Sequence, residues 1–565
     1  MLNILLKPLP LAVISVAVLI SGCNQTTLPS DKAEEGELSS YRSDINKAPV
    51  SPMVKALPTG ASQLAYMPVS LSRKKASING VSYTPPAVDN NQYNKMDTNG
   101  VISVSQQPRS TFSIDVDTGA WSQIRKTLNR GYLPPSDLVR TEEMINYFDY
   151  DYPQPESNSI PFSVYTEVGL SPWNSNTRLV HIGIQAKATP AEKRPATNLV
   201  FLLDVSGSMS TEDKLPLLKT AFKLLLNQLT EKDSVAIVVY AGASGVVLEP
   251  TAGNKKATIL EALNELSAGG STHGSAGIEL AYKLAEQAKI EGGINRIMLA
   301  TDGDFNVGTV DHDALMELIK KKRQSGITLT TLGFGSGNYN DYLMEQLADQ
   351  GNGNYAYIDT ISEAQKVLVD ELSATLETVA KDVKIQIEWN PDVVSEYRLI
   401  GYENRVLKDE DFNNDKVDAG DIGAGHTVTA LYEITLVGSK KQQIEPYHYQ
   451  QNQHKKTPSD GRFIGQNKAS ELAFLKLRYK EPQGKQSKLI SQVIKKDRRD
   501  TNSNNFNFSA AVAGFAELLR GGKYTQAWNY DSVMKLAQQS KGDDPYGYRG
   551  EFVRLVNLSK SLDNK

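Results

Sequence analysis

Two apolar runs that each lead into an aspartate constrain the fold of this 565-residue chain more than any other feature. Val200–Leu203 is followed by Asp204, and Ile297–Ala300 is followed by Thr301 and Asp302. A short, continuous apolar run bounded by turn residues is typical of a strand that is covered on both faces of a sheet. Ligands of such sheets bind beyond the carboxyl ends of the strands, where we expect both aspartates to lie.

The residues around these two runs alternate between predicted helices and predicted strands. Apolar residues at helical spacing occupy 215–229, and a second helix is expected over Ile278–Ala288. Further strands are expected over Val235–Tyr240 and Ile327–Phe334. This order predicts an α/β domain with a largely parallel, doubly wound, Rossmann-like sheet and helices on both faces.

Hydroxyl-bearing residues accompany the two aspartates and predict a metal site. Ser206 and Ser208 follow Asp204 at alternate positions, and Thr272 ends a short glycine- and serine-rich loop. Hard divalent cations prefer oxygen ligands, and Mg2+ in particular keeps waters and takes few direct carboxylates. We expect Ser206, Ser208 and Thr272 to bind the ion directly, and Asp204 and Asp302 to hold it through water or close approach. Neutral hydroxyls leave most of the charge uncancelled, so the remaining position favours an anionic oxygen, such as a carboxylate of a partner.

The pattern resembles the metal-ion-dependent adhesion site of the von Willebrand factor A (VWA) domain family. The five positions of that family fall, in its order, on Asp204, Ser206, Ser208, Thr272 and Asp302. The resemblance implies a bound Mg2+, with Mn2+ or Ca2+ as alternatives. A plainer interpretation stays open, in which Asp204 and the serines only cap the following helix.

The first 22 residues are predicted to be a lipoprotein signal peptide. Lys7 precedes the apolar run Leu11–Ile20, which is short for a membrane span. The residues that end at Cys23, the only cysteine of the chain, resemble a bacterial lipobox, in which that cysteine is lipidated. Asn24 follows, and resemblance to lipoproteins of diderm bacteria implies an anchor in the outer membrane.

The remaining chain divides by composition and pattern. Residues 23–107 are rich in Ser, Asn, Pro, Lys and Gln and are predicted to be a disordered tether. An N-terminal α+β region is expected over 108–195, the VWA domain over 196–379, a β-rich region over 380–500 and a small helical region over 501–565. Alternating strand patterns on both sides of the α/β segment predict that the VWA domain is inserted in a β-sandwich-like base.

The regions that flank the VWA domain resemble those of bacterial YfbK-type von Willebrand A lipoproteins. The resemblance is carried by FSIDVDTGAW, LPPSDLVRTEEMINYFDYDYP, YRLIGYENR and DFNNDKVDAGDIGAGHTV. Within the first stretch, Asp115 and Asp117 are expected in turn and capping roles, with Asp117 or Thr118 capping a helix that runs to Arg130. Near the other end of the chain, Lys485–Arg499 matches either a surface for anionic lipid or polymer or an ordinary amphipathic helix.

The net charge and the missing motifs give no support for nucleic-acid binding or for two common classes of enzyme. The formal net charge is −4, which gives no support for nucleic-acid binding. No GxxxxGK[ST] loop is present, Ser206 lies in VSGS rather than GxSxG, and His273 is expected to be a loop residue rather than its base. We therefore expect no enzyme, but a lipid-anchored envelope protein that grips an acidic group on a protein partner. An envelope assembly or scaffold factor with a structural metal is the alternative, and a hydrolase is the third class.

Overall fold

The computed structural model describes residues 77–78, 81–82, 91–157, 160–270, 274–303, 312–337, 339–445, 470–496 and 501–563. The chain divides into two compact units, residues 1–84 and 85–565. In the first unit, β1 (Ser77–Ile78) and β2 (Val81–Ser82) form an antiparallel pair. The predicted signal peptide and the lipidation site Cys23 lie outside the described residues. Among the residues that are described, no helix combines the length and apolarity needed to cross a membrane.

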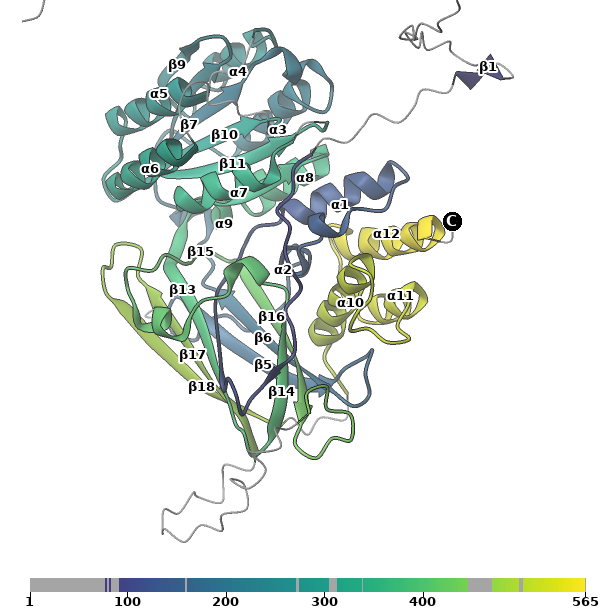
Figure 1. Cartoon of the computed structure of the whole chain (residues 1–565). Coiled ribbons are helices and arrows are strands. Elements are labelled where there is room, and N and C mark those ends of the chain that lie inside the picture. Colours follow the sequence, from purple (N-terminus) through teal and green to yellow (C-terminus); the bar gives the residue numbers. More distant parts are fainter. Residues whose placement is uncertain are drawn as a thin grey trace, which may run out of the picture. The chain divides into compact units, whose positions relative to one another are not determined.

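A six-stranded sheet forms the centre of the α/β domain (Figure 1). Its strands are β7 (Thr197–Asp204), β8 (Ser234–Tyr240), β9 (Ser244–Ala252), β10 (Ile294–Thr301), β11 (Thr328–Phe334) and β12 (Tyr355–Ile358). The strand order is β12-β11-β10-β7-β8-β9, and every pair is parallel except β8 with the edge strand β9. The largely parallel sheet expected from the sequence is confirmed.

Helices cover both faces of this sheet. They are α3 (Leu215–Asn227), α4 (Lys256–Glu265), α5 (Gly274–Gln287), α6 (His312–Lys322), α7 (Asp341–Gln350), α8 (Ile361–Gln365) and α9 (Leu372–Leu376). Alternate residues of β7 enter two separate cores: Phe201 packs with residues of α3, α4, α8 and α9, and Leu202 packs with residues of α5, α6 and α7. Burial on both faces explains why this strand is a continuous apolar run in the sequence.

Two antiparallel sheets form a sandwich on which the α/β domain is inserted. The strands before the insertion are β3 (Ile102–Ser103), β4 (Arg109–Ser113), β5 (Phe162–Leu170) and β6 (Arg178–Ala186). Those after it are β13 (Thr378–Trp389), β14 (Val394–Ile400), β15 (Gly420–Gly423), β16 (Thr427–Leu436), β17 (Glu471–Lys480) and β18 (Ser487–Lys495). One sheet has the order β15-β13-β17-β18, with β4 also paired to β13, and the other has the order β3-β14-β16-β6-β5. Because each sheet contains strands from both flanks, the predicted insertion is confirmed.

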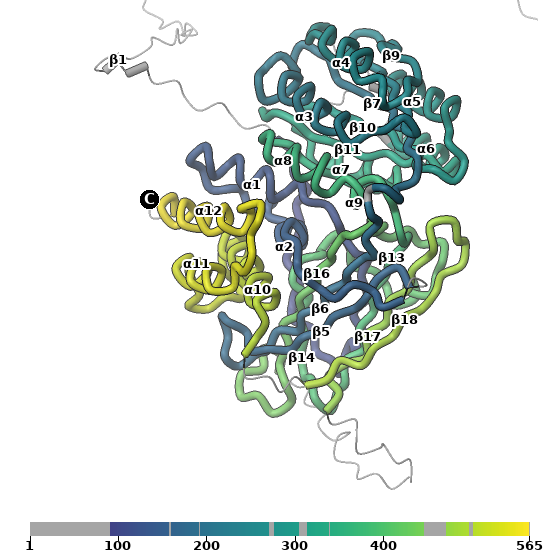
Figure 2. Tube along the Cα trace, turned by 180° about the vertical axis from the view of Figure 1, so that it is seen from behind, coloured from purple at the N-terminus to yellow at the C-terminus, as the bar shows by residue number. Residues whose placement is uncertain are grey.

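A helical layer packs beside the sandwich (Figures 1 and 2). It consists of α1 (Gly119–Asn129), α2 (Thr141–Asn146), α10 (Asn504–Leu519), α11 (Tyr530–Gln539) and α12 (Tyr548–Asp563), which share one core. Leu179 of β6 and Leu431 of β16 belong to the same core. Short 3-10 segments are η1 (Ser136–Leu138), η2 (Ala191–Lys193), η3 (Gly207–Ser210), η4 (Arg323–Ser325), η6 (Glu403–Arg405) and η7 (Asp409–Asn413), and η5 (Lys366–Asp370) is a π-helical turn.

Two expectations for the flanks need correction. The tether was expected to extend to residue 107, but β3 pairs with β14, and the Asn99 side chain donates to the carbonyl of Gly401 at 2.7 Å. The segment around Leu489 is not helical but is the edge strand β18, where Leu489 lies opposite Arg478 of β17. Its apolar spacing suits a helix, but pairing with β17 determines its conformation.

Candidate metal site

Strand register brings the two predicted aspartates to one edge of the six-stranded sheet. Asp204 is the last residue of β7, and Asp302 directly follows β10. Ala300 lies opposite Leu203 in the parallel pair of β10 with β7, so both strands end at the same level. The hydroxyl of Thr301 donates to Oδ2 of Asp204 at 2.9 Å and links the two strand ends.

Asp204 is buried, and several donors hold it in one orientation. Its Oδ1 accepts the backbone N–H of Ser206 at 2.8 Å, and its Oδ2 accepts the hydroxyl of Tyr240 at 3.3 Å. Burial raises the pKa of the Asp204 carboxyl, the hydrogen bonds from Ser206 oppose that rise, and the negative charge of Asp302 adds to it. A cation placed beside the carboxylate would favour its charged form.

The two predicted serine ligands lie together at the mouth of the site. Their Oγ atoms are 2.9 Å apart, with Ser206 buried and Ser208 exposed. The N–H of Gly207 donates to the carbonyl of Gly270 at 3.1 Å, which fixes the start of the loop that leads to Thr272. Thr272 itself and His273 lie outside the described residues.

Asp302 carries a partner that the sequence interpretation missed. The Nζ atom of Lys214, at the start of α3, lies 2.7 Å from Oδ2 of Asp302, and both side chains are almost buried. A lysine ten residues after Asp204 gives no local signal of this contact, because the pairing depends on how α3 packs on the sheet. Hydroxyl and carboxylate oxygens nevertheless converge here in the donor set that a hard divalent cation prefers, so the described residues fit such an ion.

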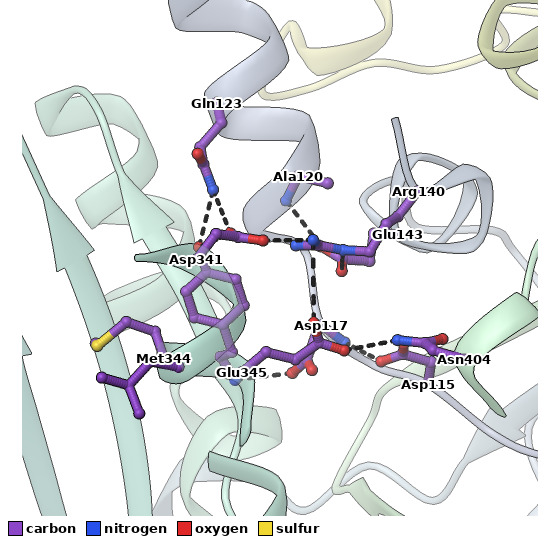
Figure 3. A network of polar contacts seen from close by, with 12 residues as sticks. Asp115, Asp117, Ala120, Gln123, Arg140, Glu143, Asp341, Met344, Glu345 and Asn404 are labelled. Carbon is purple, nitrogen blue, oxygen red and sulfur yellow. Dashed lines mark hydrogen bonds and ion pairs between the residues drawn. The ribbon is translucent and has the colours of Figure 1, made fainter. Parts of the chain in front are cut away.

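A second acidic cluster consists of other carboxylates (Figure 3). Asp115, Glu143 and Glu345 each place a carboxylate oxygen within 4.8 Å of the others, and all three are buried. They come from the segment after β4, from α2 and from α7, so the cluster joins the α/β domain to the N-terminal region. The sequence analysis considered Asp115 with Asp117 and missed Glu143 and Glu345, because these two neighbours in space are far away in the chain.

Two arginines occupy this second cluster. Arg140 pairs with Glu143 and with Asp341. Arg405 lies 3.0 Å from Asp115 and 3.2 Å from Glu345. Burial, which outweighs the two arginines, raises the pKa of Glu345 to about 8. Because the carboxylate oxygens already accept hydrogen bonds from guanidinium groups, the cluster is an ion-pair network rather than a second open site.

The expected turn role is confirmed for Asp115, but the expected cap is wrong. Oδ1 of Asp115 accepts the N–H of Asp117 at 3.0 Å, whereas Asp117 accepts the N–H of Tyr355 at 2.7 Å rather than capping α1. Thr118 precedes α1 without a side-chain capping bond. The carboxylate of Glu143, from α2, instead accepts the N–H of Ala120 at 2.7 Å. A cap supplied from another helix leaves no pattern in the local sequence.

Comparisons with known protein families cover most of the described chain. Residues 87–181 match the family described as von Willebrand factor, and residues 198–371 match the von Willebrand factor type A domain. Residues 374–562 match the family described as uncharacterized protein YfbK, C-terminal.

Individual relatives agree with these family matches. The chain is 48% identical over 477 residues to the uncharacterized protein YfbK of Escherichia coli K12, which covers 83% of this chain and 81% of that protein. It is 24% identical over 265 residues to human inter-alpha-trypsin inhibitor heavy chain H3, which covers 43% of this chain and 29% of that protein. The solved structure of von Willebrand factor type A from Catenulispora acidiphila aligns with 68% of this chain and 88% of its own at 17% identity, with a TM-score of 0.39.

Proposed function

The chain belongs to the YfbK family of proteins with a VWA domain, and from this premise we propose that it is a binding protein of the cell envelope. A divalent ion at the carboxyl edge of the VWA sheet holds an acidic group of a protein partner. The proposed ligands are Asp204, Ser206, Ser208, Thr272 and Asp302. VWA domains typically mediate protein binding, which agrees with this assignment.

One observation carries the proposal: oxygen donors converge at a sheet edge that is open to solvent. Asp204 and Asp302 are buried and held in place by hydrogen bonds, whereas Ser208 is exposed beside them. A buried carboxylate pair next to an exposed hydroxyl can hold an ion on one side and leave its other side to a ligand. When bound, the ion would supply a positive charge that attracts a carboxylate of the partner.

The choice of ion follows from the ligand types. Hydroxyl and carboxylate oxygens with no nitrogen or sulfur favour Mg2+, and Mn2+ or Ca2+ would suit the same donors. Ser206 and Ser208 would bind directly, since their Oγ atoms are neighbours at the mouth of the site. Asp204, whose oxygens already accept bonds from Ser206 and Thr301, would act through water or close approach.

The proposal places this activity at a membrane surface. Cys23 would carry the lipid anchor after removal of residues 1–22, and Asn24 favours the outer membrane of a diderm bacterium. The membrane contact is thus proposed through the lipid, and the partner through the VWA domain, without nucleic acid.

Two other functions serve as outcomes of the test. A scaffold function agrees with the ion pairs of Arg140 and Arg405, which fix α7 to the start of α2 and to η6. A hydrolase would need a general base on Ser206, whose hydroxyl lies 2.9 Å from that of Ser208 and also hydrogen bonds to the carboxyl of Asp204, a proposed metal ligand. We therefore propose no catalytic residue.

The test is capture of envelope proteins by the detergent-solubilised full chain in Mg2+, in EDTA, and with Asp204→Ala in Mg2+. Asp313→Ala, an exposed aspartate on α6, is the matched control. Capture by the wild type and by the control in Mg2+, without capture in EDTA or by Asp204→Ala, supports binding of the partner through the metal ion. Capture of the same proteins in EDTA and by Asp204→Ala would favour the scaffold function instead.

A further inference from the structure

The loop between β11 and α7 forms one wall of the proposed metal site. Gly303, next to Asp302, has a φ of +80°, and a Cβ at this position would collide with the ring of Tyr339 and lie 2.7 Å from the backbone nitrogen of Asn340. The backbone beside Asp302 therefore rests directly on Tyr339 and Asn340, with no room for a side chain between them.

The same loop also contacts the ion-pair partner of Asp302. A Cβ on Gly335 would collide with the aliphatic part of Lys214, whose Nζ pairs with Asp302. Gly335 has a φ of +74°, so a larger residue would be strained here as well as crowded. A movement of this loop would therefore displace both the backbone next to Asp302 and the lysine that pairs with Asp302.

A short segment from outside the VWA domain holds this loop. We call residues 91–93 the strap. Oδ1 of Asn91 accepts the N–H groups of Tyr339 at 2.9 Å and Gly337 at 3.3 Å. The N–H of Gln92 donates to the carbonyl of Tyr339 at 2.8 Å, and the carbonyl of Gln92 accepts the N–H of Asp341 at 3.2 Å.

Helix α1 fixes the other end of the loop. The Nζ atom of Lys126 donates to the carbonyl of Gly335 at 2.6 Å and to the hydroxyl of Tyr357 at 2.9 Å. The guanidinium of Arg130 donates to the hydroxyl of Ser336 at 2.7 Å. Figure 1 shows α1 on the side of the VWA domain where α8 also lies. Helix α1 therefore holds residues 335 and 336, and the strap holds Tyr339, the residue of the loop that contacts Gly303.

We propose that the strap is a positioning element that sets the divalent-ion affinity of the site, so that displacing the strap weakens ion binding. This inference rests on the proposed function, since it assigns regulation to the same site. The strap is covalently continuous with the residues that lead back to the predicted anchor Cys23. In the order of the chain from that anchor, the strap therefore comes before every residue of the proposed metal site.

Linkage makes the coupling measurable in both directions. If a seated strap raises ion affinity, a bound ion must stabilise the seated strap by the same factor. Net stabilisation by a hydrogen bond of this kind corresponds to a change of about fivefold in an equilibrium constant. Removing the acceptor on Asn91 should therefore weaken ion binding by about that factor.

The first experiment is calorimetric titration of the detergent-solubilised full chain with Mn2+. Asn91→Ala removes the acceptor of two N–H groups, and Asn91→Asp restores an oxygen at the same place. Asn99→Ala is the matched control, because Asn99 lies on the same segment but donates to Gly401 of the base. We expect about fivefold weaker binding for Asn91→Ala and wild-type affinity for Asn91→Asp and Asn99→Ala.

The second experiment is amide hydrogen exchange with and without saturating Mn2+. Exchange at Asp341 and Tyr339, whose N–H groups bond the strap, should slow in the wild type when the ion binds, and should slow less in Asn91→Ala. Wild-type affinity in Asn91→Ala, or an equal loss in Asn99→Ala, would overturn the inference and leave the proposed function standing. A wild-type chain that binds no Mn2+ would contradict both.

Discussion

The molecule contains two groups of acidic side chains that differ in how their charge is compensated. At the carboxyl edge of the VWA sheet, Asp204 and Asp302 lie beside two serine hydroxyls, with Lys214 as the cation in contact among the described residues. In the network around Glu345, Arg140 and Arg405 bond the carboxylates directly. The first group opens to solvent at Ser208, whereas Asp115, Glu143 and Glu345 of the second are buried and only Arg405 among its arginines is partly exposed.

This difference separates the proposed metal site from the buried ion-pair network around Glu345, which we call the structural joint. Carboxylates whose oxygens already accept hydrogen bonds from guanidinium groups have few lone pairs free to bind an ion. Removing one partner of such a buried pair leaves the other charge buried without compensation. Carboxylates mixed with hydroxyls at an open edge keep donor capacity for a ligand. An acidic cluster alone is thus a poor guide to metal binding.

The largest expected effect is on the buried network. Arg140→Met leaves Glu143 and Asp341 without their buried cation, so the free energy of unfolding should fall by about 3–5 kcal/mol. Urea denaturation measures this, with Arg554→Met as the control, because the pair of Arg554 with Glu551 is exposed and should contribute less than about 1 kcal/mol. A loss as small as that of the control would show that the network is not a joint.

The sequence predicted the open edge better than the buried joint. Asp204, Ser206 and Ser208 follow one strand at fixed spacing, so a local pattern reveals them. The pairing of Arg140 with Asp341 spans 201 residues and obeys no periodicity, so it emerges only when the chain is folded. The strap was missed for a related reason: the side chain of Asn91 and the backbone of Gln92 bond backbone groups of a loop about 245 residues away, and the polar composition of the strap is that of a linker.

The predicted fold was also more accurate where the pattern is local. Strand alternation on both sides of the VWA domain was sufficient to predict the inserted sandwich. At Leu489 the apolar spacing matched a helix, and only pairing with β17 shows that this is a strand. Local periodicity predicts burial faces well and predicts edge strands poorly, because edges have few packing partners.

The next prediction concerns the pH dependence of stability that the buried carboxyl of Glu142 causes. Burial, followed by repulsion from Glu403, raises the pKa of Glu142 to about 8, and one of its carboxylate oxygens has no hydrogen-bond partner within the described residues. A raised folded pKa gives stability that is present below the unfolded value near 4.5 and is lost as pH rises to about 8. Glu142→Gln should therefore be more stable than the wild type at pH 8, by about 2 kcal/mol, and the difference should shrink toward pH 5.

Chemical denaturation at pH 5, 6.5 and 8 measures that difference. Glu261→Gln, an exposed glutamate on α4, serves as the control and should show no such trend. A Glu142→Gln chain that gains no stability relative to the wild type between pH 5 and pH 8 would contradict the raised pKa of the Glu142 carboxyl.

The smallest expected effect concerns the cation at the open edge. The ammonium of Lys214 neutralises Asp302, so Lys214→Met should raise Mn2+ affinity by about fivefold, equivalent to about 1 kcal/mol. Lys219→Met is the control on the same helix, because Lys219 donates to backbone carbonyls of Asn264 and Leu266. Calorimetric titration distinguishes the cases, and weaker binding by Lys214→Met would mean that the lysine holds Asp302 in place for the ion.

The most direct test of the central claim is the number of Mn2+ ions bound per chain, measured by equilibrium dialysis for the wild type, Asp204→Ala and Glu345→Gln. The open-edge site predicts one ion for the wild type and for Glu345→Gln, and none for Asp204→Ala. An ion that persists in Asp204→Ala and disappears in Glu345→Gln would place metal binding in the buried network and contradict the account.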